Sequence, residues 1–398
     1  MAFSQGISGL AASAAQLDVI GNNIANSSTV GFKSGGVAFK DVIAGSRIGL
    51  GVAVAGVEQN FAAGSIQLTN RPLDLAVTNG NGFFRVASPQ GGNVSYTRNG
   101  QFTVDKDGFV VSTGGMRLTG YGVTAAGALA GGTPVPLQFP TQSMNPNATS
   151  GVTAQFNFDS RNPALDPAAF DAGDSSTYTY SNALNVFDSL GNPHELALFF
   201  IKTADNAWTV QATADGTPMT GSANITFDAN GAITGANTLA LTGDYANGSA
   251  PAAVTVTLAG STQFGNTSAV QRLTQDGYTS GNLTSFEVGR DGLVTGKYSN
   301  DQSKLLGRVV LSSFANPNGL EPTGNNEFAE TGASGQPLTG EPGEGTTLGS
   351  LTAGALESSN VDLTSELVNL ITAQRSYQAN AQTLKTQDQV MQTLVNLR

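Results

Sequence analysis

Residues 361–398 read VDLTSELVNLITAQRSYQANAQTLKTQDQVMQTLVNLR, without a glycine or a proline. Side chains at alternating intervals of four and three residues run along this stretch: Leu363, Leu367, Leu370, Gln374, Tyr377, Ala381, Leu384, Asp388, Met391 and Val395. On an α-helix this spacing forms one narrow, mostly apolar seam. Asp362 is a suitable N-cap, because its carboxylate can accept from the amides of Thr364 or Ser365. We therefore predict a C-terminal helix about 50 Å long.

The N-terminus repeats this spacing over a shorter distance. Intervals of three and four residues separate Ile7, Leu10, Ala14, Leu17, Gly21 and Ile24, which predicts a helix from about Ser4 to Ala25. Since most helical stability comes from burying an apolar face, each helix needs a partner. Pairing within one chain would leave part of the longer seam uncovered, so we expect neighbouring copies to cover it. The alternative is an ordinary amphipathic helix packed on β domains.

The apolar seam residues of both predicted helices form the candidate assembly site. Its members are Ile7, Leu10, Leu17, Ile24, Leu363, Leu367, Leu370, Tyr377, Leu384, Met391 and Val395. We predict that the chain binds copies of itself through these side chains and forms a homopolymer.

Between the two ends, short predicted strands alternate with tight turns. Leu73–Val77 and Phe83–Val86 flank the turn Asn79–Gly82, which predicts a hairpin. The same pattern follows at residues 96–111, where Asn-Gly and Asp-Gly turns separate further strands, and it returns at residues 284–314. We therefore expect these two distant segments to form one antiparallel β domain.

An insertion separates these two segments. Four prolines precede it (Pro134, Pro136, Pro140 and Pro146) and Asp276–Gly281 follows it, and both stretches are typical of domain crossings. Inside the insertion we expect strands at sandwich-like spacing: Thr177–Asp188, Glu195–Lys202, Trp208–Ala212, Ile225–Asp228 and Val254–Leu258. A second all-β domain is therefore predicted.

The predicted fold is mainly β with α-helical termini. Paired N- and C-terminal helices form a coiled-coil-like domain at residues 1–28 and 359–398, followed by two nested all-β domains. The other predicted ranges are linkers at 29–70 and 330–358, the first β domain at 71–145 and 280–329, and the inserted β domain at 146–279.

The composition argues against several classes of partner. The net charge is −11, and nearly all of the negative charge lies between the two predicted helices. Such an acidic surface repels phosphates and lipid headgroups, so we expect no nucleic-acid partner and no membrane insertion. The N-terminus lacks both the basic region and the continuous apolar core of a secretory signal, so we expect export without a cleaved signal peptide.

Candidate catalytic and metal-binding groups are scarce. The chain contains no cysteine and one histidine, His194, which stands near Asp188 and Ser189 in the sequence. A catalytic triad depends on spatial geometry, and a turn between two strands explains the same residues. Asp105–Gly108 resembles the start of a calcium loop, but Met116 stands where a glutamate would complete it. We predict no metal, no cofactor and no enzymatic activity.

Both ends resemble those of one known family. LDVIGNNIAN and TVGFK, within residues 17–33, are similar to the N-terminal signature of flagellar rod and hook proteins, and ALESSNVDL and QRSYQANA, within residues 355–381, to their C-terminal signature. The signature positions are Asn22, Asn23, Asn26, Gly31, Phe32, Lys33, Asn360, Asp362, Gln374, Arg375 and Asn380. Within the family, residues 96–102, 120–121 and 386–398 resemble the hook subunits.

The resemblance implies a structural subunit of the extracellular hook of the bacterial flagellum. Such subunits form a curved hollow tube that transmits torque from rod to filament as a universal joint. The paired helices would line the tube, the first β domain would form its wall, and the insertion would lie outside. The implied partners are the distal rod protein, the hook cap protein, the hook-filament junction protein and the flagellar type III export apparatus.

The resemblance also gives expectations for single residues. We expect Gly21 and Gly31 to allow a close approach or a turn where the first helix ends, and Phe32 to anchor the next segment to a neighbouring copy. A simple helix stop is the alternative. For the whole chain, one alternative is a distal rod protein, which would lack so long a β insertion. The others are a secreted β-rich adhesin, which would not need matching helical ends, and a polysaccharide hydrolase, which would need paired carboxylates in a cleft.

Overall fold

The computed structural model describes residues 2–43, 49–124 and 127–396. The chain forms two compact units. The helix-bearing unit comprises Met1–Thr141, Ser285–Lys297 and Ser303–Arg398, and the sandwich unit comprises Gln142–Thr284 and Tyr298–Gln302. Each unit has a hydrophobic cluster of its own.

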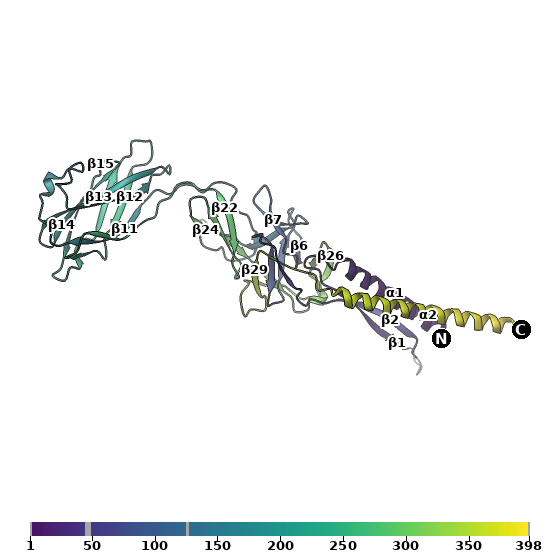
Figure 1. Ribbon diagram of the computed structural model, residues 1–398. Helices are drawn as coiled ribbons and strands as arrows, with labels where there is room; N and C mark the ends of the chain where they lie inside the picture. Colours follow the sequence, from purple (N-terminus) through teal and green to yellow (C-terminus); the bar gives the residue numbers. More distant parts are fainter. Residues whose placement is uncertain (1, 44–48, 125–126, 397–398) are drawn as a thin grey trace. The chain divides into compact units, whose positions relative to one another are not determined.

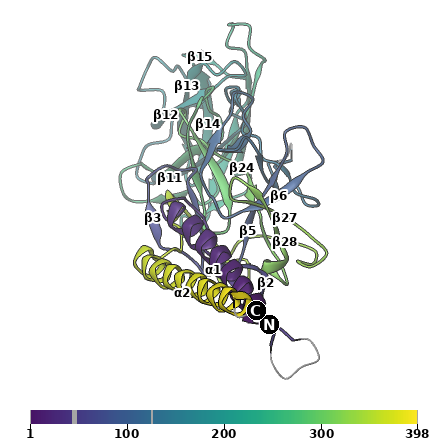
Figure 2. The same cartoon turned by 90° about the vertical axis from the view of Figure 1, so that its right-hand side faces the viewer.

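Two long helices lie side by side in the helix-bearing unit (Figures 1 and 2). α1 (Ala2–Ala25) and α2 (Leu363–Asn396) are antiparallel, and α2 extends past the N-terminal end of α1 (Figure 1). Asp362 Oδ1 accepts from the backbone amides of Thr364 at 2.9 Å and Ser365 at 3.3 Å. Both predicted helices and the predicted N-cap are therefore confirmed.

A β-hairpin packs against α1. β1 (Gly35–Val42) pairs antiparallel with β2 (Gly51–Gln59), and Gln5 Nε2 of α1 donates to the carbonyl of Gly49 at 2.6 Å. The structure adds this hairpin to residues 29–70, where composition alone predicts a linker. Glycines inside both strands dilute the alternation of polar and apolar residues, which explains why the pattern gives no strand signal there.

The other strands of this unit form one large sheet and two small ones. In the described residues the large sheet has 13 strands, with the order β22-β23-β24-β9-β5-β6-β27-β26 along its main path. They are β5 (Phe83–Ala87), β6 (Val94–Thr97), β7 (Phe102–Val104), β8 (Val110–Ser112), β9 (Arg117–Tyr121), β10 (Val135–Pro136), β22 (Leu283–Val288), β23 (Leu293–Tyr298), β24 (Ser303–Val309), β25 (Leu311–Ser313), β26 (Glu321–Gly324), β27 (Glu327–Ala329) and β28 (Leu338–Gly340). The small sheets pair β4 (Leu75–Thr78) with β29 (Ser350–Ala353) and β3 (Ile66–Leu68) with β30 (Ala355–Glu357). The segments at 71–145 and 284–314 thus contribute to one sheet, as their sequences predict.

Two predicted hairpins are wrong. The strands on either side of Asn99-Gly100, β6 and β7, pair with other strands. Leu73–Val77 and Phe83–Val86 do not pair with each other, because β4 pairs with β29 whereas β5 pairs with β6, β9 and β25. A Cβ on Gly80 would overlap the backbone of Gly349, so the glycines between the two strands permit a close backbone crossing rather than a hairpin turn. β7 and β8, by contrast, do pair across the predicted turn at Asp105–Gly108.

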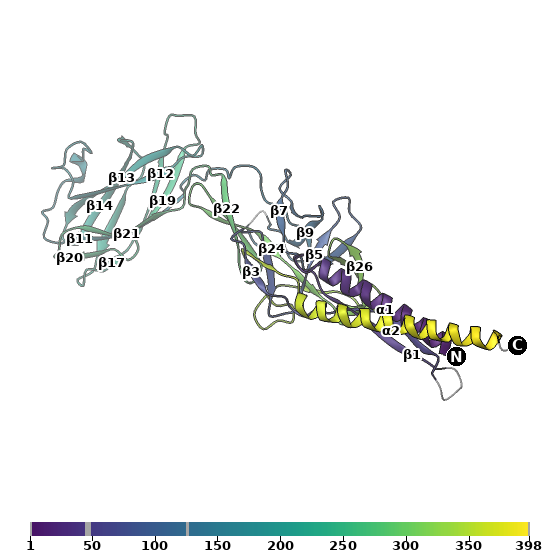
Figure 3. The ribbon, with the colours of Figure 1, turned by 45° about the vertical axis from the view of Figure 1, so that its right-hand side comes forward.

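The sandwich unit consists of two β-sheets (Figure 3). One sheet contains β11 (Gly151–Asp159), β18 (Thr238–Gly243), β19 (Ala252–Thr257), β20 (Thr262–Phe264) and β21 (Ala269–Gln275); the other contains β12 (Tyr180–Phe187), β13 (Pro193–Ala204), β14 (Ala207–Ala214), β15 (Thr217–Pro218), β16 (Ala223–Phe227) and β17 (Ile233–Thr234). Phe156, Phe158, Phe200 and Trp208 are buried in one core shared by residues of both sheets. The five predicted strands are confirmed as β12, β13, β14, β16 and β19, and the additions are β11, β15, β17, β18, β20 and β21. Short 3-10 helices, η1 (Pro167–Ala169) and η2 (Pro317–Gly319), lie in the sandwich and helix-bearing units respectively.

Candidate assembly site

Small residues on α1 let α2 approach closely. A Cβ on Gly9 would lie 2.9 Å from Asn380 Nδ2, and a Cβ on Gly6 would lie 3.2 Å from Leu384. Asn380 Nδ2 also lies 3.4 Å from Ser13 Oγ. The contact between the helices therefore rests on close approach of backbone and small side chains, with a polar group in its middle.

The face of α2 that lies against α1 repeats every seven residues. Glu366, Asn380 and Gln387 are half-buried and Ala373 is buried. At one end of this column, Asn23 Nδ2 donates to Glu366 Oε1 at 3.4 Å. Because the column is polar or small, the intrachain contact buries few of the large apolar side chains of α2.

Those apolar side chains form a second face. Leu363, Leu367, Val368 and Ile371 expose between 45% and 59% of their surface, and helical spacing places them along one stripe. Tyr377, Val390 and Met391 are also exposed farther along α2. On α1, Phe3 and Ile7 are half exposed. The paired helices thus present large apolar side chains that their own chain leaves open to solvent.

The residues of the predicted seam have different degrees of exposure. Half-buried members are Leu10, Ala14, Leu17, Ile24, Leu370, Ala381 and Leu384. Exposed members are Ile7, Gly21, Leu363, Leu367, Gln374, Tyr377, Asp388 and Met391, and the side chain of Val395 lies outside the described part. Contact between copies through the apolar members stays a prediction. The signal that identifies the intrachain face is the polar and small column with its seven-residue period.

A buried ionic cluster lies where both helices join the β region. Glu357 Oε1 accepts from Lys33 Nζ at 2.6 Å and from the amide of Gly64 at 2.9 Å, and Glu357 Oε2 accepts from Arg98 Nη1 at 3.2 Å. All three charged side chains are at least 97% buried. We call Lys33, Arg98 and Glu357 the ionic junction.

The two cations of the ionic junction have additional partners. Lys33 Nζ donates to the carbonyl of Ala62 at 2.8 Å, and Arg98 Nη2 donates to the carbonyl of Gly80 at 3.0 Å. Burial lowers the pKa of the Lys33 ammonium, although the carboxylate of Glu357 opposes this shift. Burial likewise lowers the pKa of Arg98. Burial therefore disfavours both charges, and the carboxylate of Glu357 opposes this effect at both cations.

Several signature residues surround the ionic junction. The side chain of Asn23 bonds both the amide and the carbonyl of Gly35, at 2.9 and 2.8 Å. Asn360 Oδ1 accepts from the amide of Ser34 at 2.8 Å. Gly31 has a φ of +70°, and a Cβ there would lie 2.6 Å from the amide nitrogen of Asn99. These contacts explain why asparagine and glycine suit positions 23, 31 and 360.

The remaining signature residues have looser surroundings. Asn26 Nδ2 donates to Asn22 Oδ1 at 2.9 Å, and Phe32 is half-buried. Gln374 and Arg375 are exposed on α2. Gly21 is exposed within α1, and apart from its chain neighbours and the local helix backbone, no atom of the described residues lies within 4 Å of the position that its Cβ would occupy. The expected close approach is therefore absent at Gly21 in this chain, whereas Gly31 provides it.

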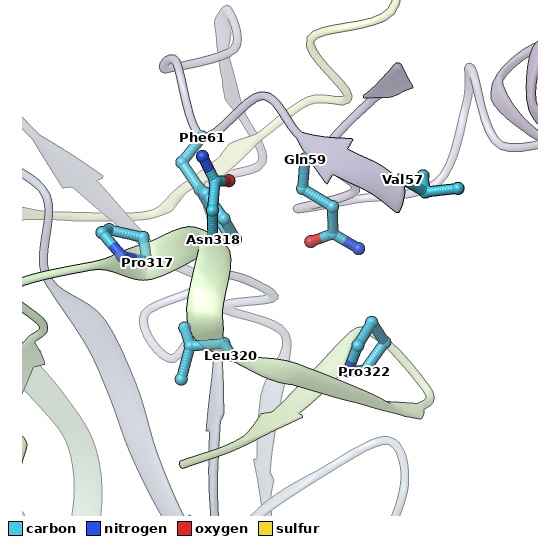
Figure 4. A pocket seen from close by; sticks show the side chains of 7 residues that line it. All are labelled: Val57, Gln59, Phe61, Pro317, Asn318, Leu320 and Pro322. Atoms are coloured by element: carbon cyan, nitrogen blue, oxygen red, sulfur yellow. The ribbon is translucent and has the colours of Figure 1, made fainter. Parts of the chain in front are cut away.

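The described part of the helix-bearing unit has surface hollows, and two of them are well defined. One, of about 210 Å³, is lined by Val57, Gln59, Phe61, Pro317, Asn318, Leu320 and Pro322 (Figure 4). The other, of about 330 Å³, is lined by Asn26, Thr29, Asn99, Thr113, Gly114, Asn325 and Asn326. The linings of these two hollows contain no histidine, carboxylate, lysine or arginine, so neither hollow has the groups for general acid-base chemistry.

His194 lies in a surface cluster of the sandwich unit. Its Nδ1 lies 2.6 Å from Asp215 Oδ2, its Nε2 lies 3.3 Å from Asp188 Oδ2, and its ring stacks on Tyr245 at 3.7 Å. Ser189 Oγ instead accepts from the amide of Ala250 at 2.9 Å. The imidazole is thus held between two carboxylates, which is an ion-pair arrangement and not a Ser-His-Asp relay.

No helix in the described ranges combines the length and apolar character needed to cross a membrane. Nor do three or more histidine, cysteine, aspartate or glutamate side chains gather anywhere in that part of the chain in a way that could hold a metal ion.

Four family models match successive parts of the chain. They are the flagella basal body rod protein (residues 4–33), the flagellar hook protein FlgE/F/G D1 domain (77–152), the flagellar basal body protein FlaE D2 domain (157–278) and the flagellar basal body rod FlgEFG protein C-terminal region (352–397). The matched ranges include most of both helices, the large-sheet strands β5 to β10 and most of the sandwich. These matches define the class as the rod and hook proteins of the flagellum.

Full-length relatives narrow the class. The chain is 45% identical to the flagellar hook proteins FlgE of Salmonella typhimurium and Escherichia coli, over 100% of each chain, and 34% identical to that of Borreliella burgdorferi, over 99% of this chain and 98% of the relative. A crystal structure of the Helicobacter pylori hook protein FlgE2 has a similar fold, with a TM-score of 0.53 at 14% identity, covering 73% of this chain and 99% of that one. The chain belongs to the flagellar hook protein family and is a structural protein of the flagellar hook.

Proposed function

We propose that the chain polymerises with itself into the curved hollow tube of the hook, which acts as a universal joint between rod and filament. The single observation that carries the proposal is the exposed apolar stripe on α2 formed by Leu363, Leu367, Val368 and Ile371. An apolar face of this kind on a long helix needs a cover, and the partner helix α1 packs on a different face. A second copy of the chain is the natural cover.

The regions divide the mechanical work. The paired helices, residues 1–28 and 359–398, give the tube its permanent contacts and its inner lining. The β region, residues 71–145 and 280–329, forms the wall. The segments at 29–70 and 330–358, in which the structure has strands of its own where linkers were predicted, join wall and helices. The sandwich, residues 146–279, lies outside and provides compliance, because polar and hydrated contacts rearrange more easily than close-packed apolar ones.

The protein acts without catalysis and without a cofactor. The two hollows carry no titratable lining, and His194 is fully engaged by two carboxylates. We also propose that the chain leaves the cell through the flagellar export apparatus with its N-terminus retained, and that it contacts the distal rod protein, the hook cap protein and the hook-filament junction protein. A rigid distal rod protein and a secreted adhesin are less favoured, since the full-length relatives are named hook proteins.

Electron microscopy of purified chains tests self-assembly. Under polymerising conditions the wild-type chain is expected to form hollow tubes, and a truncation that lacks residues 361–398 is expected to form none. The sharper variant is L367S/I371S, which removes two exposed apolar side chains from α2. It should abolish tubes while it leaves the unfolding temperature of the monomer within about 2 °C of wild type, because these side chains are only half buried in one chain.

A matched control uses the same spacing on a polar part of the same helix. Gln378 and Gln382 are exposed on α2, so Q378S/Q382S should still form tubes. Tubes of normal yield from L367S/I371S would refute assembly through the stripe. A wild-type chain that stays monomeric at high concentration, with both helices protected, would refute self-assembly itself.

A further inference from the structure

The ionic junction joins three separate parts of the chain. Lys33 follows α1, Arg98 lies between β6 and β7, and Glu357 lies in β30, shortly before α2. One carboxylate contacts both cations, with one oxygen for each. Lys33 and Arg98 also donate hydrogen bonds to the carbonyls of Ala62 and Gly80, which are neutral. Glu357 is therefore the anion that the cluster needs, and it comes from the C-terminal end of the chain.

The electrostatic cost of burying these charges depends on whether the two ends of the chain dock together or one at a time. If the segment after α1 docked alone, Lys33 would enter a site that already contains Arg98, and two cations would share a buried space without an anion. If the segment before α2 docked alone, Glu357 would retain only the longer of its two ion pairs, to Arg98 at 3.2 Å. Burial is electrostatically favourable only when both ends are present.

Further contacts in this region also cross between the two ends. The amide of Gly31 donates to the carbonyl of Glu357 at 2.8 Å, and the amide of Ser34 donates to Asn360 Oδ1. Asn360 Nδ2 donates in turn to the carbonyl of Asn60 at 2.7 Å. Each of these bonds needs a donor from one end of the chain and an acceptor from the other.

We propose that Lys33, Arg98 and Glu357 form an interlock that makes the docking of the N-terminal segment and the docking of the C-terminal segment depend on each other. A purely apolar junction would let either end dock first. The interlock instead couples α1 and α2 through their attachment points, so that both helices are fixed to the β region together or both are released. This inference does not rest on the proposed mode of assembly, because the coupling acts inside one chain.

A charge cycle tests the interlock. The variants are Glu357→Gln, Lys33→Met and the double variant, all in the full chain, and the measurement is hydrogen exchange at residues 31–34 and at the first turns of α2. Exchange is measured either in the monomer or in the sedimented polymer, whichever of the two protects these amides in the wild-type chain. E357Q should accelerate exchange at both ends by about a hundredfold or more, since it leaves two buried cations unpaired.

The double variant distinguishes an interlock from ordinary structural contacts. Removal of the Lys33 charge relieves the like-charge burial in E357Q, so K33M/E357Q should exchange at least about tenfold more slowly than E357Q. Independent structural contacts predict the opposite, a double variant as fast as E357Q or faster. That result would overturn the proposal, as would acceleration at the α2 end alone, or free exchange of residues 31–34 in both states of the wild-type chain.

Two internal controls accompany the cycle. Glu344→Gln removes a carboxylate from an exposed ion pair with Arg290 and should leave exchange at the junction unchanged. The fluorescence of Trp208, the single tryptophan, reports on the sandwich unit and should be the same in every variant. A changed Trp208 signal in E357Q would mean that the substitution acts through global unfolding, which contradicts the proposal.

Discussion

The sandwich unit and the terminal helices differ in how far they bury their large apolar side chains. In the sandwich, Phe158 and Trp208 are completely buried in a core to which both sheets contribute. On α2, Leu367 and Ile371 remain about half exposed although α1 lies beside the helix. One region is complete within a single chain, and the other, under the proposed function, is completed by further copies. On that proposal, stability of the monomer and capacity for assembly reside in different parts of one polypeptide.

The largest expected effect comes from breaking the closed core. Phe158→Ala should destabilise the sandwich by about 3–5 kcal/mol, because it leaves a cavity beside Trp208 and Phe200. Thermal unfolding followed by Trp208 fluorescence measures this loss. If the two regions are independent, the same variant should still form tubes, because the helices are untouched.

Deletion of the sandwich is the extreme form of this test. Asn147 and Tyr278 pair with each other, so removal of residues 148–277 keeps the two ends of the cut adjacent. The shortened chain should form tubes whose bending stiffness differs from that of wild type. Loss of all tubes, in this deletion or in F158A, would show that assembly depends on the sandwich and would remove the contrast between the regions.

Two glycines of α1 give an intermediate effect. Gly9→Val should force the helices apart, because even a Cβ at this position lies 2.9 Å from Asn380, and the expected loss is about 1–3 kcal/mol. Gly21→Ala on the same helix should instead stabilise α1 by up to about 1 kcal/mol, since the space around Gly21 is open. Unfolding followed by circular dichroism compares the two. Equal effects at both positions would contradict the close approach at Gly9.

The smallest expected effect is a pH dependence confined to the sandwich. Burial alone lowers the pKa of His194, but hydrogen bonds to Asp215 and Asp188 outweigh it, so the pKa is raised. A raised pKa means that the folded state binds the proton more tightly. The resulting stabilisation is complete below about pH 6.5, the unfolded value, and disappears as the pH rises through the folded value.

The midpoint of sandwich unfolding should accordingly fall by a few degrees as the pH rises through the folded pKa of His194. His194→Gln should remove this dependence while tube formation stays normal. Because His194 is the single histidine, its imidazole signal in an NMR titration gives the folded pKa directly. A titration at or below about pH 6.5 would contradict the predicted direction.

Local patterns predicted the elements better than their pairing. The long spacing pattern at residues 361–398 and the cap at Asp362 identified α2 because each is a local property of the chain. Asn-Gly at residues 99–100 suggested a hairpin, yet β6 and β7 pair with other strands. Strand partners such as β4 and β29 are distant in sequence, and no local pattern encodes that choice.

The candidate site shows the same division. Sequence periodicity found the apolar residues of both helices, but it could not tell the face that meets α1 from the face that stays open, because both repeat with helical spacing. The family resemblance identified Lys33 as a signature position. Arg98 and Glu357 lie inside stretches that resemble the family, but nothing in the sequence singled them out. Their meeting at one buried carboxylate depends on three chain segments that only the folded structure brings together.

The points at which the chain enters and leaves the sandwich unit are adjacent. Met144 pairs with Gly281 and Asn147 pairs with Tyr278, so the two ends of the insertion are held by backbone hydrogen bonds of 2.7–3.2 Å. A module anchored in this way can be exchanged for a longer, shorter or foreign one without forcing its host apart. In evolution, such a cassette is free to diverge faster than its flanks. In engineering, it offers a grafting position that would display one copy of a chosen domain for every subunit of a polymer.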